Sequence, residues 1–405
     1  MTAKWTWLVY MAGDNNLESQ GPIDLREMQR VGSSADVNII VQFDTERQRT
    51  MRYRVDKGRL TTLQSLRGVD CGDPRVLTEF LTWGTQTFPA ERYAVVIWNH
   101  GGGWEDDDLD YDESRGRKPR AIARKHRAQR SLFRTTQEAV KQRGAQQLIA
   151  IDCGAQDYLD NQELRAAFER ANLKVDLLGF DACLMSMLEI AYEMRDTATC
   201  MVGSEETEPG AGWPYAEILA ALTKTPSMPT TKLAGLIVDE HAAWYRAGKG
   251  SQWDDCATQS AVALGHVTKL AQAVDALAVA LCANMKTSRS ILSLAAQGAL
   301  AFDEPSYVDL GHFVSRVEEE AGKASAVGKA AQKVLGLLKP SAGVVVNNGL
   351  WGNSVKDAMG VSMFFPTPKQ LRRLDTLLAS YDKLRFNVDY PGWRTMLAGY
   401  AKALG

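Results

Sequence analysis

Five short apolar segments in the first half of the chain lack the polar–apolar alternation that marks a half-exposed strand. They cover residues 6–11, 37–43, 93–98, 175–180 and 200–203. Strands of this kind are typically buried on both faces, as in a parallel sheet with helical crossovers. Helical patterns lie between them, at residues 75–88, 161–171 and 184–195. We therefore predict an α/β sandwich with right-handed crossovers and a mostly parallel central sheet.

Two local signals add detail to this sheet. Asp73 followed by Pro74 is a favourable N-cap with proline at the first helical position, so a helix is expected to begin there. Residues 50–63 are interrupted by the turn-forming Asp-Lys-Gly at 56–58, which indicates an antiparallel hairpin added to the sheet.

From about Pro226 onward the pattern becomes mainly helical. Helical periodicity covers residues 231–246, 267–285, 309–320, 325–338 and 369–381. Two strand candidates, residues 343–346 and 361–365, could extend the sheet. We predict a core domain at residues 1–225 and a mainly helical C-terminal domain at residues 226–405, with the junction at residues 226–229.

Composition argues against several protein classes. The 405 residues carry 47 Lys and Arg against 49 Asp and Glu, a charge of −2, which disfavours a protein built to hold nucleic acid or an anionic membrane. The six cysteines form no C-x-x-C pair, which disfavours a disulfide scaffold and a zinc ribbon. No apolar run reaches the ~18–20 residues of a membrane span, and residues 1–12 resemble a buried strand more than a secretion signal. A cytoplasmic protein with reduced thiols is the default expectation.

One segment is distinguished by its charge. Residues 105–113 hold seven carboxylates in nine positions, and residues 115–134 hold nine Arg or Lys and no acid. Such blocks are typical of solvated loops in which the two charges balance. The acidic run could instead bind calcium, which takes about six to eight oxygen ligands, although it lacks the spacing of an EF-hand. Nucleic-acid binding by the basic block is disfavoured, because Phe133 is its one aromatic residue.

Two chemically active side chains follow neighbouring strands at their carboxyl ends. His100 comes just after residues 93–98 and precedes three glycines, and Cys183 follows residues 175–180. Open α/β sheets place their sites at this edge, and side chains leaving strands ~4.8 Å apart can meet. A thiol beside an imidazole suits nucleophilic catalysis, with Cys183 as the nucleophile and His100 as the proton donor to a leaving amine.

The backbone around both residues favours the same chemistry. A helix expected to begin near Leu184 would lower the pKa of Cys183, as would the imidazole. The N–H groups of Gly101 and Cys183 could supply the two donors of an oxyanion hole, each worth ~3 kcal/mol in related chemistry.

Asp181 lies two residues before Cys183, so both side chains should leave the same face of the strand. A carboxylate in this place opposes ionisation of the thiol unless a cation arrives. An arginine side chain would supply that cation, because it pairs with a carboxylate through two parallel hydrogen bonds. Asp181 therefore predicts cleavage after basic residues, although it could also simply cap the following helix.

Several pieces of the sequence carry a family resemblance. They read WTWLVYMAGDNNLE, RYAVVIWNHGGGW, LLGFDACLM and VGSEETEPGAGWPY, with YVDLGHF, GVSMFFP and FNVDYPGWRTML in the C-terminal half. Together they resemble the clostripain family of cysteine peptidases, relatives of caspases, gingipains and legumain, over nearly the whole chain. The resemblance implies a caspase-like three-layer αβα sandwich, a dyad of Cys183 and His100, and peptide or protein substrates with Arg or Lys before the scissile bond. It also implies that Asp181 lies at the base of the pocket.

The same resemblance implies further features of the site. The acidic strand end would form another wall of the cleft, through Ser204, Glu205 and Glu206. Some relatives cut themselves after a basic residue in the loop that follows the histidine, and the nearest candidates here are Arg115, Arg117, Lys118 and Arg120. Some relatives depend on calcium and others do not, so we expect no required cofactor.

An alternative function is a catalytically inactive, caspase-like scaffold or binding protein. The presence of Cys183, His100 and Asp181 together disfavours it. We expect no membrane or nucleic-acid partner, and the sequence leaves the oligomeric state open. The remaining histidines show no metal-like spacing, and the other cysteines are expected to be structural thiols.

Overall fold

The computed structural model describes residues 2–45, 49–104, 149–152, 157–251 and 254–404. Its centre is a nine-stranded sheet with the order β12-β10-β9-β8-β5-β1-β2-β3-β4. The strands in chain order are β1 (Ala3–Ala12), β2 (Val37–Asp44), β3 (Arg49–Asp56), β4 (Arg59–Arg67), β5 (Ala90–Trp98), β8 (Val175–Asp181), β9 (Ala198–Gly203), β10 (Ala257–Ala263) and β12 (Val345–Trp351). The five apolar segments predicted as strands are β1, β2, β5, β8 and β9, and they pair in parallel as expected.

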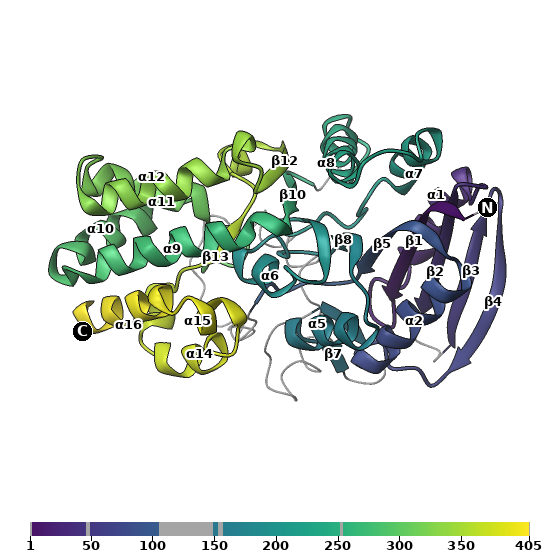
Figure 1. Cartoon of the computed structure of the whole chain (residues 1–405), viewed down its shortest axis with the longest axis horizontal. Coiled ribbons are helices and arrows are strands. Elements are labelled where there is room, and N and C mark those ends of the chain that lie inside the picture. Colours follow the sequence, from purple (N-terminus) through teal and green to yellow (C-terminus); the bar gives the residue numbers. More distant parts are fainter. Residues whose placement is uncertain (1, 46–48, 105–148, 153–156, 252–253, 405) are drawn as a thin grey trace.

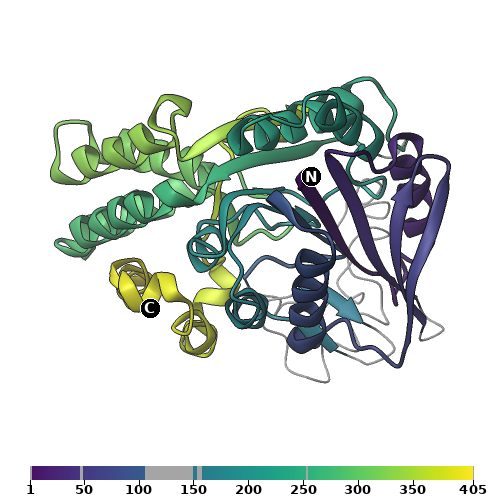
Figure 2. The same cartoon turned by 45° about the vertical axis from the view of Figure 1, so that its right-hand side comes forward.

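Antiparallel strands complete the sheet at both edges. The hairpin β3–β4 pairs with β2 at one edge, which confirms the prediction for residues 50–63. At the other edge β10 pairs antiparallel with β9 and with β12. Figures 1 and 2 show the hairpin at one end of the molecule and the C-terminal helices gathered at the other.

Helices cover both faces of the sheet, because alternate residues of the buried strands point to opposite sides. From β1, Trp5, Trp7 and Val9 pack with helices α1 (Gly21–Val31), α7 (Tyr215–Lys224) and α8 (Thr230–Arg246). Leu8 and Tyr10 pack on the other face with α2 (Pro74–Thr87), α5 (Asn161–Arg170) and α6 (Leu188–Glu193). The result is the predicted three-layer αβα sandwich. The helix α2 begins as expected, with the Asp73 side chain accepting the N–H of Arg75.

The C-terminal half is mainly helical but contributes to the same sheet. Its helices are α9 (Val267–Cys282), α10 (Met285–Gly298), α11 (Leu310–Ala321), α12 (Ala326–Leu338), α13 (Pro368–Leu371), α14 (Leu374–Tyr381), α15 (Arg385–Asp389) and α16 (Gly392–Leu404). Because β10 and β12 belong to the central sheet, that sheet continues across the domain junction predicted near residue 226. Of the two predicted strands, β12 extends the sheet. The predicted strand at residues 361–365 is present as β13 (Ser362–Phe364), but it pairs with β11 (Tyr307–Asp309) and does not extend the central sheet.

One described helix, residues 264–282, is long and apolar enough to cross a membrane by length and composition. It contains α9, whose apolar side chains belong to the core and which packs against α6, α12 and α16. Those contacts are typical of a core helix.

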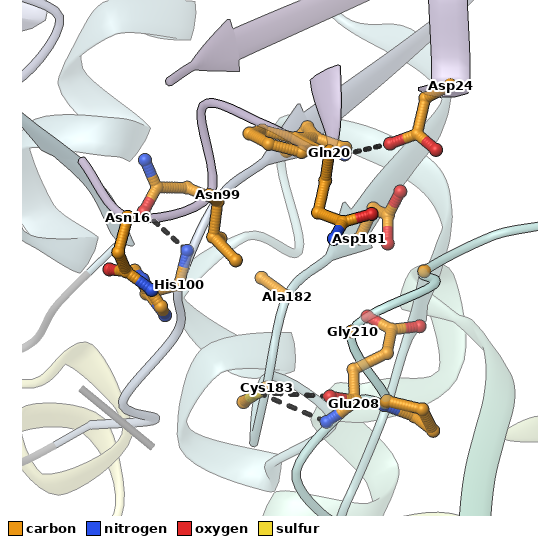
Figure 3. Close-up of a pocket in the computed structure, with 14 residues that line it drawn as sticks. Asn16, Gln20, Asp24, Asn99, His100, Asp181, Ala182, Cys183, Glu208 and Gly210 are labelled. Carbon is orange, nitrogen blue, oxygen red and sulfur yellow. Dashed lines mark hydrogen bonds between the residues drawn. The ribbon is translucent and has the colours of Figure 1, made fainter. Parts of the chain in front are cut away.

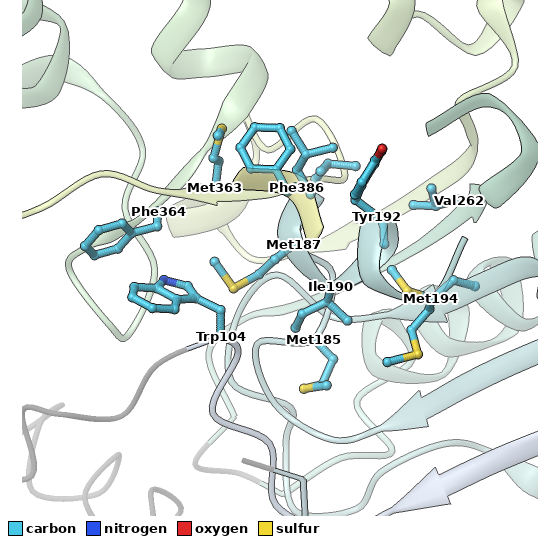
Figure 4. Close-up of a cluster of buried hydrophobic side chains, with 14 of the residues drawn as sticks. Trp104, Met185, Met187, Ile190, Tyr192, Met194, Val262, Met363, Phe364 and Phe386 are labelled. Carbon is cyan, nitrogen blue, oxygen red and sulfur yellow. The ribbon is translucent and has the colours of Figure 1, made fainter. Parts of the chain in front are cut away.

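The glycine-rich loop that follows His100 is anchored by two side-chain hydrogen bonds, one of them from the C-terminal half. The Tyr307 hydroxyl donates to the carbonyl of Gly102 at 2.8 Å, and the Asn161 amide donates to that of Gly103 at 3.2 Å. Trp104 ends this loop in an aromatic cluster, edge-on to Phe364 and Tyr381 (Figure 4). These contacts fix the backbone on one side of the candidate site.

Candidate active site

A pocket of about 260 Å³ opens where β5 and β8 end, beside the turn that follows β1 (Figure 3). Its lining residues come from those strand ends, from the start of α1 and from the loop after β9. They are Asn16, Leu17, Gln20, Asp24, Trp98, Asn99, His100, Asp181, Ala182, Cys183, Glu208, Pro209, Gly210 and Gly212. The pocket therefore brings together Cys183, His100 and Asp181, as the strand order predicts.

His100 is held at the end of β5 by its own neighbour and by the turn after β1. The Asn99 side chain accepts the backbone N–H of His100 and donates to the carbonyl of Ala12. The Nε2 atom of the His100 ring lies 2.8 Å from Oδ1 of Asn16. Burial lowers the pKa of His100 to about 4, so the ring is neutral near pH 7.

Cys183 faces the loop after β9. Its Sγ accepts the N–H of Glu208 at 3.1 Å and lies 3.9 Å from the Glu208 carbonyl oxygen (Figure 3). Burial raises the pKa of the Cys183 thiol to about 12, and the carboxylates of Glu208, Asp303 and Glu206 add to this effect. The thiol of the empty pocket is therefore protonated at neutral pH.

The helix expected to lower this pKa does not begin near Leu184, so that prediction is wrong. Leu184 adopts a left-handed conformation with φ of 61°, and the chain turns there. Ser186 and Met187 then pair with Ser204 and Ser362 respectively. The helix α6 begins only at Leu188, so its first turn does not follow directly after the sulfur as predicted.

Three carboxyl groups line the pocket, and no Arg or Lys stands among the described lining residues. Asp181 accepts the Tyr215 hydroxyl at 2.7 Å, and Asp24 accepts Nε1 of Trp98 at 2.7 Å. Burial raises the pKa of Asp181 well above its ordinary value, and the Glu208 charge raises it further. Burial is also the main cause that raises the pKa of Asp24 and of Glu208. Such a pocket favours a ligand that brings a positive charge.

Glu208 has a second neighbour behind the pocket wall. Its Oε1 lies 3.3 Å from Nε2 of His241, and both side chains are almost fully buried. Burial lowers the pKa of His241 to about 3, so this histidine is a neutral partner and brings no positive charge to Glu208.

A family model described as the clostripain family matches residues 9–123 and 137–379. The chain belongs to the clostripain family. Clostripain from Hathewaya histolytica is 25% identical over 245 residues, which cover 53% of this chain. The match spans 41% of that relative's length.

Two solved structures share the fold over almost the whole chain. A secreted C11 cysteine protease from Bacteroides thetaiotaomicron, in complex with an irreversible peptide inhibitor, has a TM-score of 0.67 and 21% identity and covers 95% of this chain and 98% of its own. An inactive zymogen C11 protease from Parabacteroides distasonis has a TM-score of 0.67 and 17% identity, with coverage of 96% and 99%. At these identities the likeness establishes the caspase-like fold.

Other residues predicted for the site are not among those that line the pocket. Ser204, Glu205 and Glu206 are buried, and the Glu206 charge is one cause of the raised Cys183 pKa. The Ser204 hydroxyl contacts Thr258, while Glu205 accepts the N–H of Gly360. That these three form a wall of the cleft stays a prediction. The acid that the loop after β9 contributes to the pocket lining is Glu208.

The sequence contained weak signals for the acidic residues that were missed. Glu208 lies in the same VGSEETEPGAGWPY piece, two residues past Glu206, but nothing in the piece shows which acid turns inward. Asp24 lies in the first turn of α1 and belongs to no motif. Its place in the site follows only from the packing of α1 beside β5.

Gly101 approaches the backbone of Cys183 closely. A Cβ at Gly101 would lie 2.3 Å from the Cys183 carbonyl oxygen, so only glycine fits there. Gly101 forms a bridge with Ile149 and is not among the pocket-lining residues. Its role as an oxyanion donor stays a prediction.

Several predictions fall on residues that the structure does not describe. Residues 105–113, with their suggested calcium site, lie outside the described part of the chain, as do Arg115, Arg117, Lys118 and Arg120. Within the described residues, no group of three or more His, Cys, Asp or Glu could hold a metal ion. The described cysteines are free thiols: Cys71, Cys183, Cys200, Cys256 and Cys282.

Proposed function

We propose that this protein is a cysteine endopeptidase that cleaves after Arg or Lys, with Cys183 as the nucleophile and His100 as the general acid and base. The observation that carries the proposal is one pocket that holds a thiol, an imidazole and three carboxyl groups. Its volume, about 260 Å³, is below the ~300–1,000 Å³ of sites that enclose drug-sized ligands. That volume suits a single long side chain.

The chemistry starts from an uncharged pair. The Cys183 thiol transfers its proton to His100 as the sulfur attacks the peptide carbonyl. His100 then delivers this proton to the leaving amine, and an acyl-enzyme remains on the sulfur. Water hydrolyses the acyl-enzyme with His100 acting as the base. The backbone N–H groups of Cys183 and Gly101 are the proposed donors to the oxyanion.

A basic substrate side chain would act on both affinity and reactivity. The carboxylate of Asp181 would pair with the cation, and Glu208 would be partly neutralised by it. Because the Glu208 charge is one cause of the raised Cys183 pKa, its neutralisation lowers that pKa. An uncharged substrate side chain gives neither effect.

The test compares arginine peptides with citrulline peptides, which have the same shape but no charge. We expect Asp181→Asn to lower kcat/KM on the arginine peptide at least ~30-fold, because it removes one partner of a buried charge pair. The citrulline peptide should change less than about threefold. Asp176→Asn is the matched control, because Asp176 lies on β8 at the opposite end from the pocket and accepts the N–H of Tyr93.

If Asp181→Asn lowers kcat/KM equally on both peptides, Asp181 does not determine the preference for a positively charged side chain. A wild-type protein that cleaves neither peptide and resists labelling by an arginyl chloromethylketone would refute the peptidase function itself. The same labelling separates a working site from an inactive scaffold, because the reagent must place its arginyl side chain in the pocket and must also react with a nucleophilic Cys183.

We also propose that the chain cuts itself after Arg115, Arg117, Lys118 or Arg120. The support comes from the sequence and from the proposed specificity: Arg115 follows His100 by 115 − 100 = 15 residues, so the candidate bonds lie close in the chain to a site proposed to cleave after Arg or Lys. Mass spectrometry of the wild type and of Cys183→Ala should show two fragments only for the wild type. A wild-type chain that stays intact while it cleaves peptides would refute self-processing.

The expectation of a cytoplasmic location gains no support from the relatives. One solved relative is named as a secreted protease, and we propose secretion as the alternative.

A further inference from the structure

We propose that Asn16 is a positioning residue that holds His100 as the Nε2–H tautomer, so that Nδ1 is the atom that exchanges protons with Cys183 and the leaving amine. This inference rests on the proposed peptidase function, which gives His100 its role. Asn16 lies in the WTWLVYMAGDNNLE piece, which by itself gives the residue no role, and its assignment comes from one contact in the structure.

The contact indicates which tautomer the ring adopts. The Asn16 atom that lies 2.8 Å from Nε2 is the side-chain oxygen Oδ1, which can accept a hydrogen bond but cannot donate one. With Oδ1 turned toward the ring in this way, the contact favours the hydrogen on Nε2. Since burial keeps the ring neutral near pH 7, a single hydrogen is available, and Nδ1 is left with its lone pair.

Within the described residues, the ring of His100 makes no other hydrogen bond. The neighbouring Asn99 side chain binds the backbone of His100 and the carbonyl of Ala12, so it fixes the loop. Asn16 is therefore the group that can select between the two neutral forms of the imidazole.

The turn after β1 is built to present Asn16. The preceding Asn15 donates from its amide to the carbonyl of Ala12 at 2.9 Å and accepts the N–H of Leu17 at 2.9 Å. The Ala12 carbonyl also accepts the Asn99 amide, so one oxygen ties the ends of β1 and β5 together. Asn15 thus shapes the turn, and Asn16 is left to face the pocket.

The first measurement reads the tautomer without catalysis. In ¹⁵N-histidine-labelled full-length protein, the His100 resonances are assigned by comparison with His100→Gln. We expect a protonated-type shift at Nε2 and an unprotonated-type shift at Nδ1 in the wild type. The opposite pattern would overturn the inference whether or not the protein is a peptidase.

The second measurement uses two variants of Asn16 on the arginine peptide. Asn16→Ala should lower kcat ~10- to 100-fold with less than about threefold change in KM, because substrate contacts remain while the ring loses its partner. Asn16→Asp keeps an acceptor oxygen and should recover most of kcat. Its added negative charge should also move the acid limb of the kcat/KM profile to higher pH, since it stabilises the imidazolium.

The acid limb of Asn16→Asp reports whether residue 16 contacts the His100 ring, because the other titratable groups of the pocket stay unchanged: Asp24, Asp181, Cys183 and Glu208. An unshifted limb would show that residue 16 does not contact the imidazole, and the inference would be wrong. Asn38→Ala is the matched control, since the Asn38 amide contacts Thr6 near the amino end of β2. If the wild type cleaves the arginine peptide but Asn16→Ala keeps wild-type kcat, the inference is wrong and the peptidase function stands. If Asn16→Ala does not fold, the tautomer of the wild type and the acid limb of Asn16→Asp decide the question.

Discussion

The Cys183 thiol gives the sharpest quantitative prediction, the rate at which iodoacetamide alkylates it in the protein without an added ligand. The Cys183 pKa of about 12 lies ~3 units above its ordinary value of 9.0, so ~1,000-fold less thiolate is present at pH 7. A more basic thiolate is also more nucleophilic, by ~15- to 30-fold for ~3 units at a Brønsted coefficient of about 0.4–0.5. The net expectation is alkylation ~30- to 60-fold slower than that of an unperturbed cysteine.

The assay follows modification of the Cys183 peptide by mass spectrometry between pH 6 and pH 10. Because His100 has a pKa of about 4, it stays neutral over this range and forms no ion pair with the sulfur. The rate should therefore rise ~10-fold per pH unit without a plateau. Mass spectrometry separates Cys183 from the other thiols, and Cys183→Ala confirms the peptide assignment.

A plateau in the alkylation rate below about pH 8 would refute this reasoning, because it would reveal a thiolate–imidazolium pair in the empty pocket. A second arm uses agmatine, an alkyl guanidine without a scissile bond. We expect agmatine to accelerate alkylation, because a cation beside Glu208 opposes one of the charges that raise the thiol pKa. If saturating agmatine does not accelerate alkylation, the charge in the acidic pocket does not control the reactivity of Cys183.

Two further predictions concern stability. Burial raises the pKa of Glu189 from 4.5 to about 7, so ionisation of this carboxyl destabilises the folded state once the pH exceeds 4.5. Glu189→Gln removes that penalty. In urea titrations it should raise the free energy of unfolding by about 3 kcal/mol at pH 8.5 and by under ~1 kcal/mol at pH 5. An equal gain at both pH values would contradict this origin. Gly212→Ala should cost ~1–2 kcal/mol, because Gly212 has a φ of +60° and the new Cβ would lie 2.8 Å from Oδ1 of Asp181. Gly210→Ala meets nothing within 4 Å and should stay within ~0.5 kcal/mol, so similar thermal midpoints for the two variants would refute the packing argument.

The central sheet was predictable because burial on both faces leaves a strong sequence signature. Runs such as residues 37–43 contain too few polar residues for a solvent-facing strand, and Asp73 with Pro74 marks the start of α2 unambiguously. The strand β10 was missed because ATQSAVA is poor in large apolar residues. Its buried Thr258 and Ser260 are satisfied by hydroxyl contacts with Ser204 and Ser186, which no local pattern reveals.

The sequence predicted which strand ends carry the site, but not the detailed arrangement of the residues around them. That His100 and Cys183 line one pocket follows from β5 and β8 being neighbours. The left-handed Leu184, which turns the chain before α6 begins, could not be read from the sequence because leucine rarely adopts that conformation. Asp24 and Glu208 were missed for a different reason, since their roles depend on how α1 and the loop after β9 pack against the sheet.

Because α6 begins later than predicted, one expected cause of a lowered Cys183 pKa is missing. A helix N-terminus at Cys183 would activate the thiol permanently, whatever side chain occupied the pocket. Without it, and with a neutral His100 beside the pocket acids, the sulfur is held mainly as the protonated thiol. On the proposed function, the cation that selects the substrate is also the charge that lowers the Cys183 pKa. A citrulline peptide should then be disfavoured in kcat as well as in KM, since it lacks the charge that ionises the thiol. A penalty confined to KM would show that Asp181 and its neighbouring acids only bind the substrate.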